Sequence, residues 1–407
     1  MCPWFRVERN EEAKRVYREF EAYSNIKDST MAKMSDVLQD LVVEVLSKIP
    51  LTSLRAVRLT CKKWNDVSKD RSFIKKQIGE AKKKQVNEFE VIMITNFKVY
   101  LMSVDLHSHV DPSITPKGTL TSLNDEVNDI RRVFHCDGLL LCITKDLNFR
   151  LVVWNPYFGQ TKWIKPRNCY HRLDNYALGY DENKKYKVLR FVDDSNAYRV
   201  EERICVFELY SFESDLWKVV LNVSPEWEMK FCSRGLSVKG NTYWYATDHL
   251  DEDVDFLICF DFTAERFGPR LPLPFNASAS NEDIVTLSNV GEEQFAVLFQ
   301  DDDTLRMEIW VTSKVEPTEV SWNKFLAVDM SPLIRFAFLG EAGSFFIDQT
   351  KDVAVVFDKD IDSFYTRGIA YIIGKEGYFK KVDLGEVADP NCYPLVLMFQ
   401  AQCKSVS

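Results

Sequence analysis

The chain has 407 residues, of which 46% are hydrophobic and 28% charged, a balance typical of a soluble globular protein with two or three domains. We expect no membrane span and no secretory signal, and the ten scattered cysteines, with no C-x-x-C pair, indicate reduced thiols in the nucleus or cytosol. Residues 1–84 carry 19 Lys and Arg against 12 Asp and Glu, a net charge of +7, whereas the rest carries 33 against 49, a net charge of −16, which disfavours nucleic acid as a partner.

Residues 1–33 form an N-terminal extension ahead of the first recognisable unit. The stretch "EEAKRVYREFEAY" could make one amphipathic helix, but a loosely ordered extension is the simpler expectation.

Residues 34–80 have apolar side chains at helical spacing. One stripe consists of Leu41, Val45, Leu46 and Ile49, and Pro50 ends that helix because the residue before a proline avoids the α region. Further apolar faces follow at Leu54, Val57, Cys61, Trp64 and Val67. Three or four short helices in about 45 residues cannot bury all these faces on themselves, so this unit has apolar surface to offer a partner.

These residues resemble an F-box, the motif that docks onto the Skp-type adaptor of cullin–RING ubiquitin ligases. The resemblance rests on Asp40-Leu41, Glu44-Val45-Leu46, Ile49-Pro50, Ser53-Leu54, Arg58, Cys61-Lys62 and Trp64. The family usually opens with Leu-Pro, and this chain has Val37-Leu38 instead, which loses the fixed φ of proline. We expect the adaptor to contact Leu38, Leu41, Leu46, Ile49, Pro50, Leu54, Val57 and Trp64. The alternative is a helical hairpin that only packs on the body.

From about residue 86 the chain turns into short strands rich in Val, Ile, Phe and Tyr, separated by turns such as Asp137-Gly138 and Lys239-Gly240. An apolar strand, a turn-former and an aromatic strand recur at Trp154, Tyr210, Phe262, Val311 and Phe357, with spacings of 56, 52, 49 and 46 residues. A period near 50 in an all-β chain is typical of propeller blades of kelch length. Residues 86–403 therefore predict about six blades, with the early "FEVIMIT" and "KVYLMSV" closing the ring against the late "LVLMFQA". A pair of β-sandwiches is the alternative fold.

The body also resembles the type-one F-box-associated domain of the large plant families. The matching phrases include "HCDGLLLC", "RLVVWNPYFGQTKWI", "YALGYD", "ELYSFESDLWKV" and "LICFDFTAERFGPRLPLPF". The predicted fold is mainly β: a small α-helical F-box at 34–80 followed by a kelch-like, six-bladed β-propeller at 86–403. We expect the two to be separable domains, joined near residues 81–88.

Several groups of residues could suggest a catalytic or metal site, but each has a simpler explanation. His135, Cys136 and Asp137 stand in a row, but neighbouring strand residues point to opposite faces, so a hairpin turn at Asp137-Gly138 explains them better. The pair His107 and His109 lacks further ligands at metal spacing, and the acidic runs at 251–255 and 301–303 lack the EF-hand pattern. We expect no metal, no cofactor and no catalytic residues.

The sequence favours a substrate receptor of an SCF-type ubiquitin ligase: the F-box holds the Skp-type adaptor and through it the cullin, and the propeller holds an unidentified target protein. Such a chain does no chemistry and needs no membrane. The alternatives are a β-propeller enzyme with a helical appendage and a scaffold whose F-box has decayed.

Overall fold

The computed structural model describes parts of residues 41–79 and most of residues 88–398. The described residues are 41–47, 49, 57–58, 61–70, 72–73, 75–76, 79, and 88–398 with gaps at 107–112, 120–128, 147–148, 157–159, 169–173, 193–204, 224–225, 230–233, 249–253, 276–282, 302, 331–343, 361–366 and 388–394. The N-terminal extension and the pair His107 and His109 therefore lie outside the described residues.

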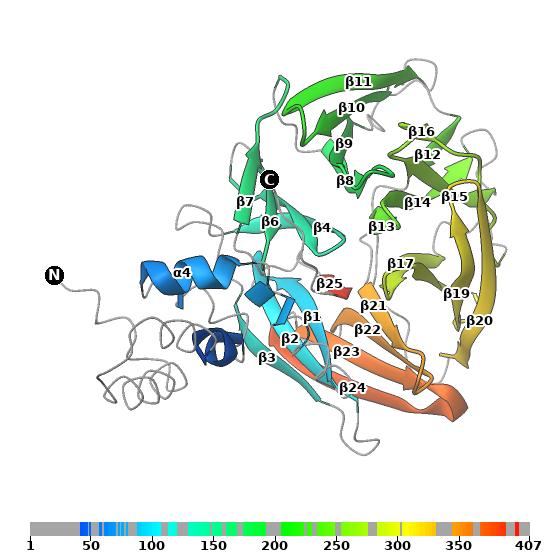
Figure 1. The fold of residues 1–407 in the computed structure, drawn as a ribbon. Coiled ribbons are helices and arrows are strands. Elements are labelled where there is room, and N and C mark those ends of the chain that lie inside the picture. Colours follow the sequence, from blue (N-terminus) through cyan, green and yellow to red (C-terminus); the bar gives the residue numbers. More distant parts are fainter. Residues whose placement is uncertain are drawn as a thin grey trace.

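Six antiparallel sheets surround a central axis and form a six-bladed β-propeller (Figure 1). We number the blades one to five after the closing blade, which joins both ends of the body. The closing blade contains β25 (Leu395–Met398), β1 (Glu88–Thr95), β2 (Lys98–Asp105) and β3 (Ser113–Thr119). Blade one contains β4 (Ile130–Cys136), β5 (Leu139–Thr144), β6 (Leu151–Asn155) and β7 (Gln160–Ile164). Blade two contains β8 (Asp174–Tyr180), β9 (Tyr186–Val192), β10 (Cys205–Ser211) and β11 (Leu216–Val223).

The remaining blades follow the same order from axis to rim. Blade three contains β12 (Trp227–Met229) and β13 (Leu236–Val238), which both pair with β14 (Asn241–Asp248), then β15 (Asp255–Asp261) and β16 (Arg266–Phe267). Blade four contains β17 (Ile284–Val290), β18 (Gln294–Gln300), β19 (Arg306–Glu316) and β20 (Glu319–Asp329). Blade five contains β21 (Ser344–Asp348), β22 (Val353–Asp360), β23 (Arg367–Gly374) and β24 (Phe379–Glu386), with the short helix η4 (Lys375–Gly377) before β24.

The ring closes as the sequence predicted. The C-terminal β25 pairs with β1, in a register that sets Val91 opposite Met398 and Ile94 opposite Leu395. Across the neighbouring seam the N–H of Val396 donates to the Ser344 hydroxyl at 2.9 Å. The prediction of six blades is thus confirmed, and the β-sandwich alternative is wrong because the six sheets form one ring.

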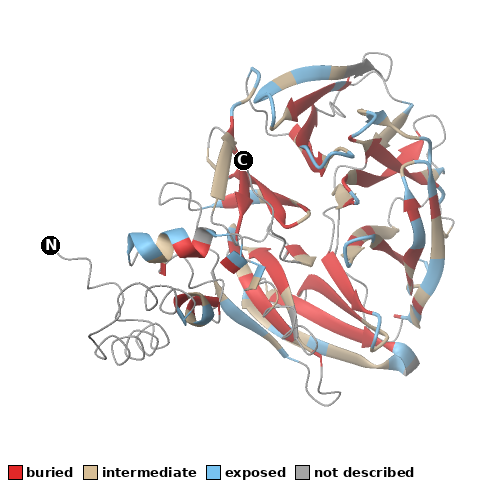
Figure 2. Cartoon of the chain, in the orientation of Figure 1, coloured by how far each residue is buried: buried red, intermediate tan, exposed pale blue. Residues whose placement is uncertain are grey.

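The core is divided among the gaps between blades. Six apolar clusters each lie between two adjacent blades, so the middle strands are covered on both faces. This explains why β5, "LLLCIT", and β6, "LVVWN", are buried along their whole length and show no polar alternation. Burial falls toward the rim, where the outer strands are half-buried or exposed (Figure 2).

One predicted repeat position is wrong. Trp154, Tyr210 and Val311 lie on the third strand of their blades and Phe262 directly follows a third strand, but Phe357 lies on β22, the second strand of blade five. The sequence "VVFDKD" there copies the apolar-then-turn pattern, but its strand continues to Asp360 instead of turning at Asp358. The third strand, β23, ends in Gly374 and lacks that signal.

The longer helical segments described in the F-box are residues 41–47 and α4 (Lys62–Lys69), and both lie outside the ring beside the closing blade and blade one (Figure 1). Neither is long and apolar enough to cross a membrane.

Candidate functional site

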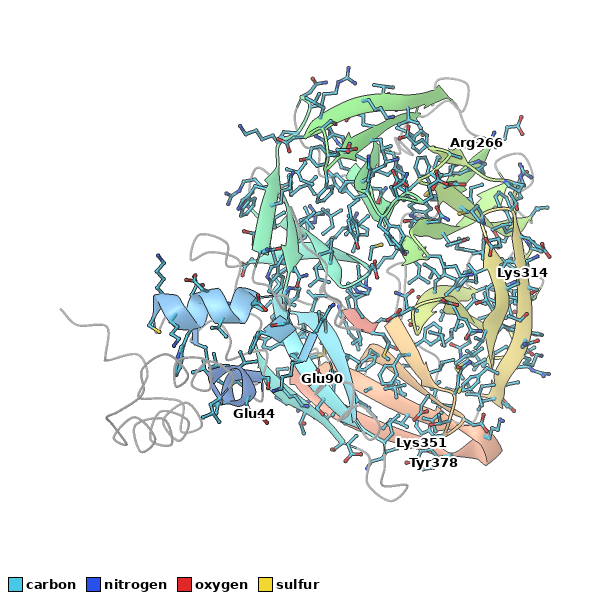
Figure 3. All side chains as sticks on the ribbon, viewed as in Figure 1. Glu44, Glu90, Arg266, Lys314, Lys351 and Tyr378 are labelled. Carbon is cyan, nitrogen blue, oxygen red and sulfur yellow. The ribbon has the colours of Figure 1, made fainter. Side chains whose placement is uncertain are left out.

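The helix of residues 41–47 divides its apolar residues between two sides. Val42 and Leu46, one helical turn apart, are 3% and 1% exposed, whereas Leu41 is 47% exposed. The Ile49 N–H donates to the Leu46 carbonyl at 3.1 Å, which ends the helix before Pro50. Glu44 lies on the outer side and reaches Lys76 at 3.0 Å, an exposed pair worth at most about 1 kcal/mol (Figure 3). One face of the helix is therefore committed to the core and another is open.

The second described helix is held by polar contacts to the preceding segment. The Arg58 guanidinium donates to the Ser68 hydroxyl at 3.1 Å, and Ser68 in turn donates to the Asn65 carbonyl at 2.9 Å. Burial lowers the pKa of Arg58 to about 10. After the helix, the Asp70 carboxylate accepts from the Ser72 hydroxyl and, at 2.8 Å, from the Ser72 N–H, and these hydrogen bonds lower the pKa of Asp70. The Arg58–Ser68 bond thus ties this helix to the segment before it.

The F-box core is continuous with the core of the propeller. Five buried F-box residues belong to the same apolar cluster as residues of the closing blade and of blade one. They are Val42, Leu46, Val57, Val67 and Phe73. The blade residues of that cluster include Ile92, Leu101, Val133, Leu140 and Trp154. Phe73 has no exposed surface. The described F-box residues thus pack against the propeller, and the domain boundary near residues 81–88 stays a prediction.

The eight residues expected at the adaptor interface fall into three groups. Leu41 is exposed, and Ile49 and Trp64 are partly buried against the shared cluster. Leu46 and Val57 are buried, at 1% and 6% exposure. Leu38, Pro50 and Leu54 lie outside the described residues. Spacing identified a helical stripe but did not say which of its residues the propeller covers.

The stretch "HCDG" forms the tight turn between β4 and β5. Asp137 and Gly138 have φ of 52° and 80°, as a two-residue hairpin of this kind requires. His135 accepts the Gly138 N–H on Nε2 at 3.1 Å, and burial lowers its pKa to about 4, so the imidazole is neutral. The hairpin prediction is confirmed.

That turn also lies at one mouth of the central channel, which the sequence did not reveal. His135 lines a hollow of about 60 Å³ along the axis, bounded by β4, β13, β17 and β25. A smaller hollow of about 40 Å³ at the mouth is lined by Asp137, Tyr180, Lys239 and Glu292, among others. The Tyr186 hydroxyl donates to Asp137 at 2.9 Å there. The channel has room for a few water molecules.

The acidic runs at 251–255 and 301–303 contain carboxylates that accept hydrogen bonds from neighbouring residues of the propeller. Asp255 accepts the Thr247 hydroxyl at 2.6 Å and the Tyr245 hydroxyl, and Asp301 accepts the N–H of Thr304 at 2.7 Å. Among the described residues, no group of three His, Cys, Asp or Glu side chains could hold a metal ion. Burial raises the pKa of the Cys142 thiol, and it raises that of Cys259 to about 12.

Comparisons with known proteins agree with this architecture. Residues 35–76 match the family model described as "F-box domain", and residues 90–402 match "F-box associated beta propeller domain". The F-box protein At5g42460 of Arabidopsis thaliana is 67% identical over 381 residues, covering 91% of this chain and 97% of that protein. The F-box/kelch-repeat protein At3g16740 of the same plant is 56% identical, covering 91% and 98%.

Solved structures resemble the chain only loosely. An oligogalacturonate lyase from Vibrio parahaemolyticus covers 72% of this chain and 78% of its own, with 8% identity and a TM-score of 0.38. A likeness of this size says nothing about activity.

Proposed function

Because the chain belongs to the plant F-box proteins in which an F-box-associated β-propeller follows the F-box, we propose that it is a substrate-recognition subunit of an SCF-type ubiquitin ligase. The F-box binds the Skp-type adaptor and through it the cullin, and the propeller binds a target protein. The observation that carries this proposal is an F-box with one face packed on the propeller and Leu41 on an open face.

The eight expected residues would serve the adaptor in two ways. Leu41 is exposed and would contact the adaptor directly, together with the open parts of Ile49 and Trp64. Leu46 and Val57 have almost no surface, so they would act by holding the helices in place. Leu38, Pro50 and Leu54 complete the proposed interface, and Val37-Leu38 in place of Leu-Pro would weaken it.

The chain would contribute proximity rather than chemistry. A target held on the propeller is kept near the ubiquitin-conjugating enzyme, which raises its effective concentration. The apolar cluster shared by the F-box and the propeller favours this role, because a propeller packed on the F-box limits the positions that a bound target can take.

The test is co-purification with the adaptor. Leu41→Asp buries a charge at a contact and should weaken binding by at least about 30-fold, since truncating or charging a central anchor costs ~2 kcal/mol or more. Val254→Asp is the matched control, because Val254 is 42% exposed but lies in the propeller, and it should bind normally. Unchanged adaptor binding by Leu41→Asp would contradict the proposed surface, and no binding by the parent chain would favour the decayed F-box.

A further inference from the structure

The outer edge of blade two is unusually apolar for a propeller rim. Five large hydrophobic side chains are exposed among the described residues, and three of them lie on its last two strands. Leu216 and Val219 on β11 are 68% and 44% exposed, and Val206 on β10 is 38% exposed. Figure 2 shows β11 as a largely exposed ribbon. Single exposed apolar residues need no explanation, but a group on adjacent strands does.

The strand that carries this group also has an open edge. β11 pairs with β10 on one side, and no described strand pairs with its other side. Alternate N–H and C=O groups of an edge strand point outward, where another extended chain can replace water as their hydrogen-bond partner.

Other rim strands carry the features that commonly prevent such pairing. β16 has two residues, β3 contains Pro116, and β24 carries Lys380 and Lys381. On β11 the one charged residue between Leu216 and Val220 is Lys218, whose ammonium forms an ion pair with Glu265 on blade three. Over Leu216–Val220, β11 has neither a proline nor a second charged side chain to oppose a partner strand.

The apolar side chains line both faces of this edge. Val219 stands directly opposite Glu208, so it shares a face with Glu208 and with Val206 two residues away. Leu216 pairs with Ser211 and lies on the other face from Trp217. A strand added to β11 would find apolar contacts for side chains on both of its faces.

The carboxylates at both ends of β11 favour a partner strand with cationic ends. Glu213 and Asp215, 63% and 73% exposed, lie in the turn before β11, and exposed Glu226 follows its end. Lys185 and Lys162 pair with the first two, yet the body as a whole has a net charge of −16. Pairing with β11 of a second copy would bring carboxylates to carboxylates in either strand direction. An apolar strand with cations at its ends meets no such repulsion.

We propose that β11 is a target-docking edge, on which an extended, apolar segment of the target protein with flanking Lys or Arg adds as a fifth strand of blade two. This inference rests on the proposed function, since it names the class of segment that the propeller receives. Main-chain hydrogen bonds supply affinity in such strand addition, and the alternating side chains supply specificity.

The experiment selects nine-residue peptides displayed on phage against the full-length chain. The enriched peptides should alternate apolar residues and carry Lys or Arg near their ends, and they should slow amide hydrogen exchange in residues 216–223. Val219→Lys should weaken their binding at least about tenfold, because it adds a like charge and removes an apolar contact. Val254→Lys, at 42% exposure on blade three, is the control that should bind them normally.

Several outcomes would overturn the docking edge. These are no enriched peptide, enriched peptides that bind Val219→Lys as well as the parent, or protection confined to other strands. A concentration-dependent dimer lost in Val219→Lys would instead assign the edge to a second copy. Adaptor co-purification is measured on the same proteins and should be equal in the parent and both variants. Its failure in the parent would overturn the ligase role while the peptide measurement still reports on the edge.

Discussion

Replacing Phe73 by Ala should destabilise the whole protein rather than the F-box alone. Phe73 has no exposed surface and belongs to the cluster that includes Ile92 and Trp154 of the propeller. Truncating a buried Phe to Ala costs about 3–5 kcal/mol through lost burial and the cavity that remains. At about 2 °C per kcal/mol for a large chain, the melting temperature should fall by roughly 6–10 °C.

The measurement is differential scanning calorimetry of the full chain. If the cluster couples the two parts, one main transition appears and Phe73→Ala moves all of it. The control is Leu41→Ala, in the same F-box but 47% exposed, which should change the unfolding free energy by less than about 0.5 kcal/mol. Two transitions, of which Phe73→Ala moves only the smaller, would refute the coupling and support a propeller that folds without the F-box.

Three further substitutions test the interior of the propeller. Burial lowers the pKa of His135 to about 4, against 6.5 in the unfolded chain, so the unfolded chain takes up the proton first as the pH falls. The unfolding free energy should therefore decrease by about 3 kcal/mol between pH 6.5 and pH 4. His135→Gln should remove that part of the slope in urea titrations at several pH values, and an identical slope would count against the burial argument. Arg190→Met removes the buried cation shared by the carboxylates of Asp174 and Glu208 and should cost about 3–5 kcal/mol of unfolding free energy. Arg167→Met, 45% exposed, should cost less than about 1 kcal/mol, and equal losses would contradict the ion-pair reasoning. A methyl group on Gly240, at φ +86°, would lie 2.5 Å from the Tyr180 ring, whereas one on Gly291, at φ +65°, would meet open space. Gly240→Ala should therefore lower the melting temperature well beyond Gly291→Ala. Similar losses in the two variants would show that backbone strain, and not the steric clash, causes the destabilisation.

The sequence alone determined the elements whose signals are local. The F-box could be predicted from an apolar helical stripe, a proline that ends the helix and a dense set of motif residues. Tight turns such as Asp137-Gly138 were readable because few residues accept positive φ. The period near 50 residues predicted the blades, and the apolar C-terminal "LVLM" predicted ring closure, since a propeller needs a partner for its first strand.

Which surfaces are open depends on how distant parts of the chain pack together. Leu41 and Leu46 belong to one apolar stripe, but the propeller covers Leu46 and leaves Leu41 exposed. The sequence of β11 resembles that of a buried strand, and its position at the end of the sheet is what leaves Leu216 and Val219 exposed. Burial depends on neighbours that are distant in the chain, and a periodic pattern records that a face is apolar without recording what packs against it.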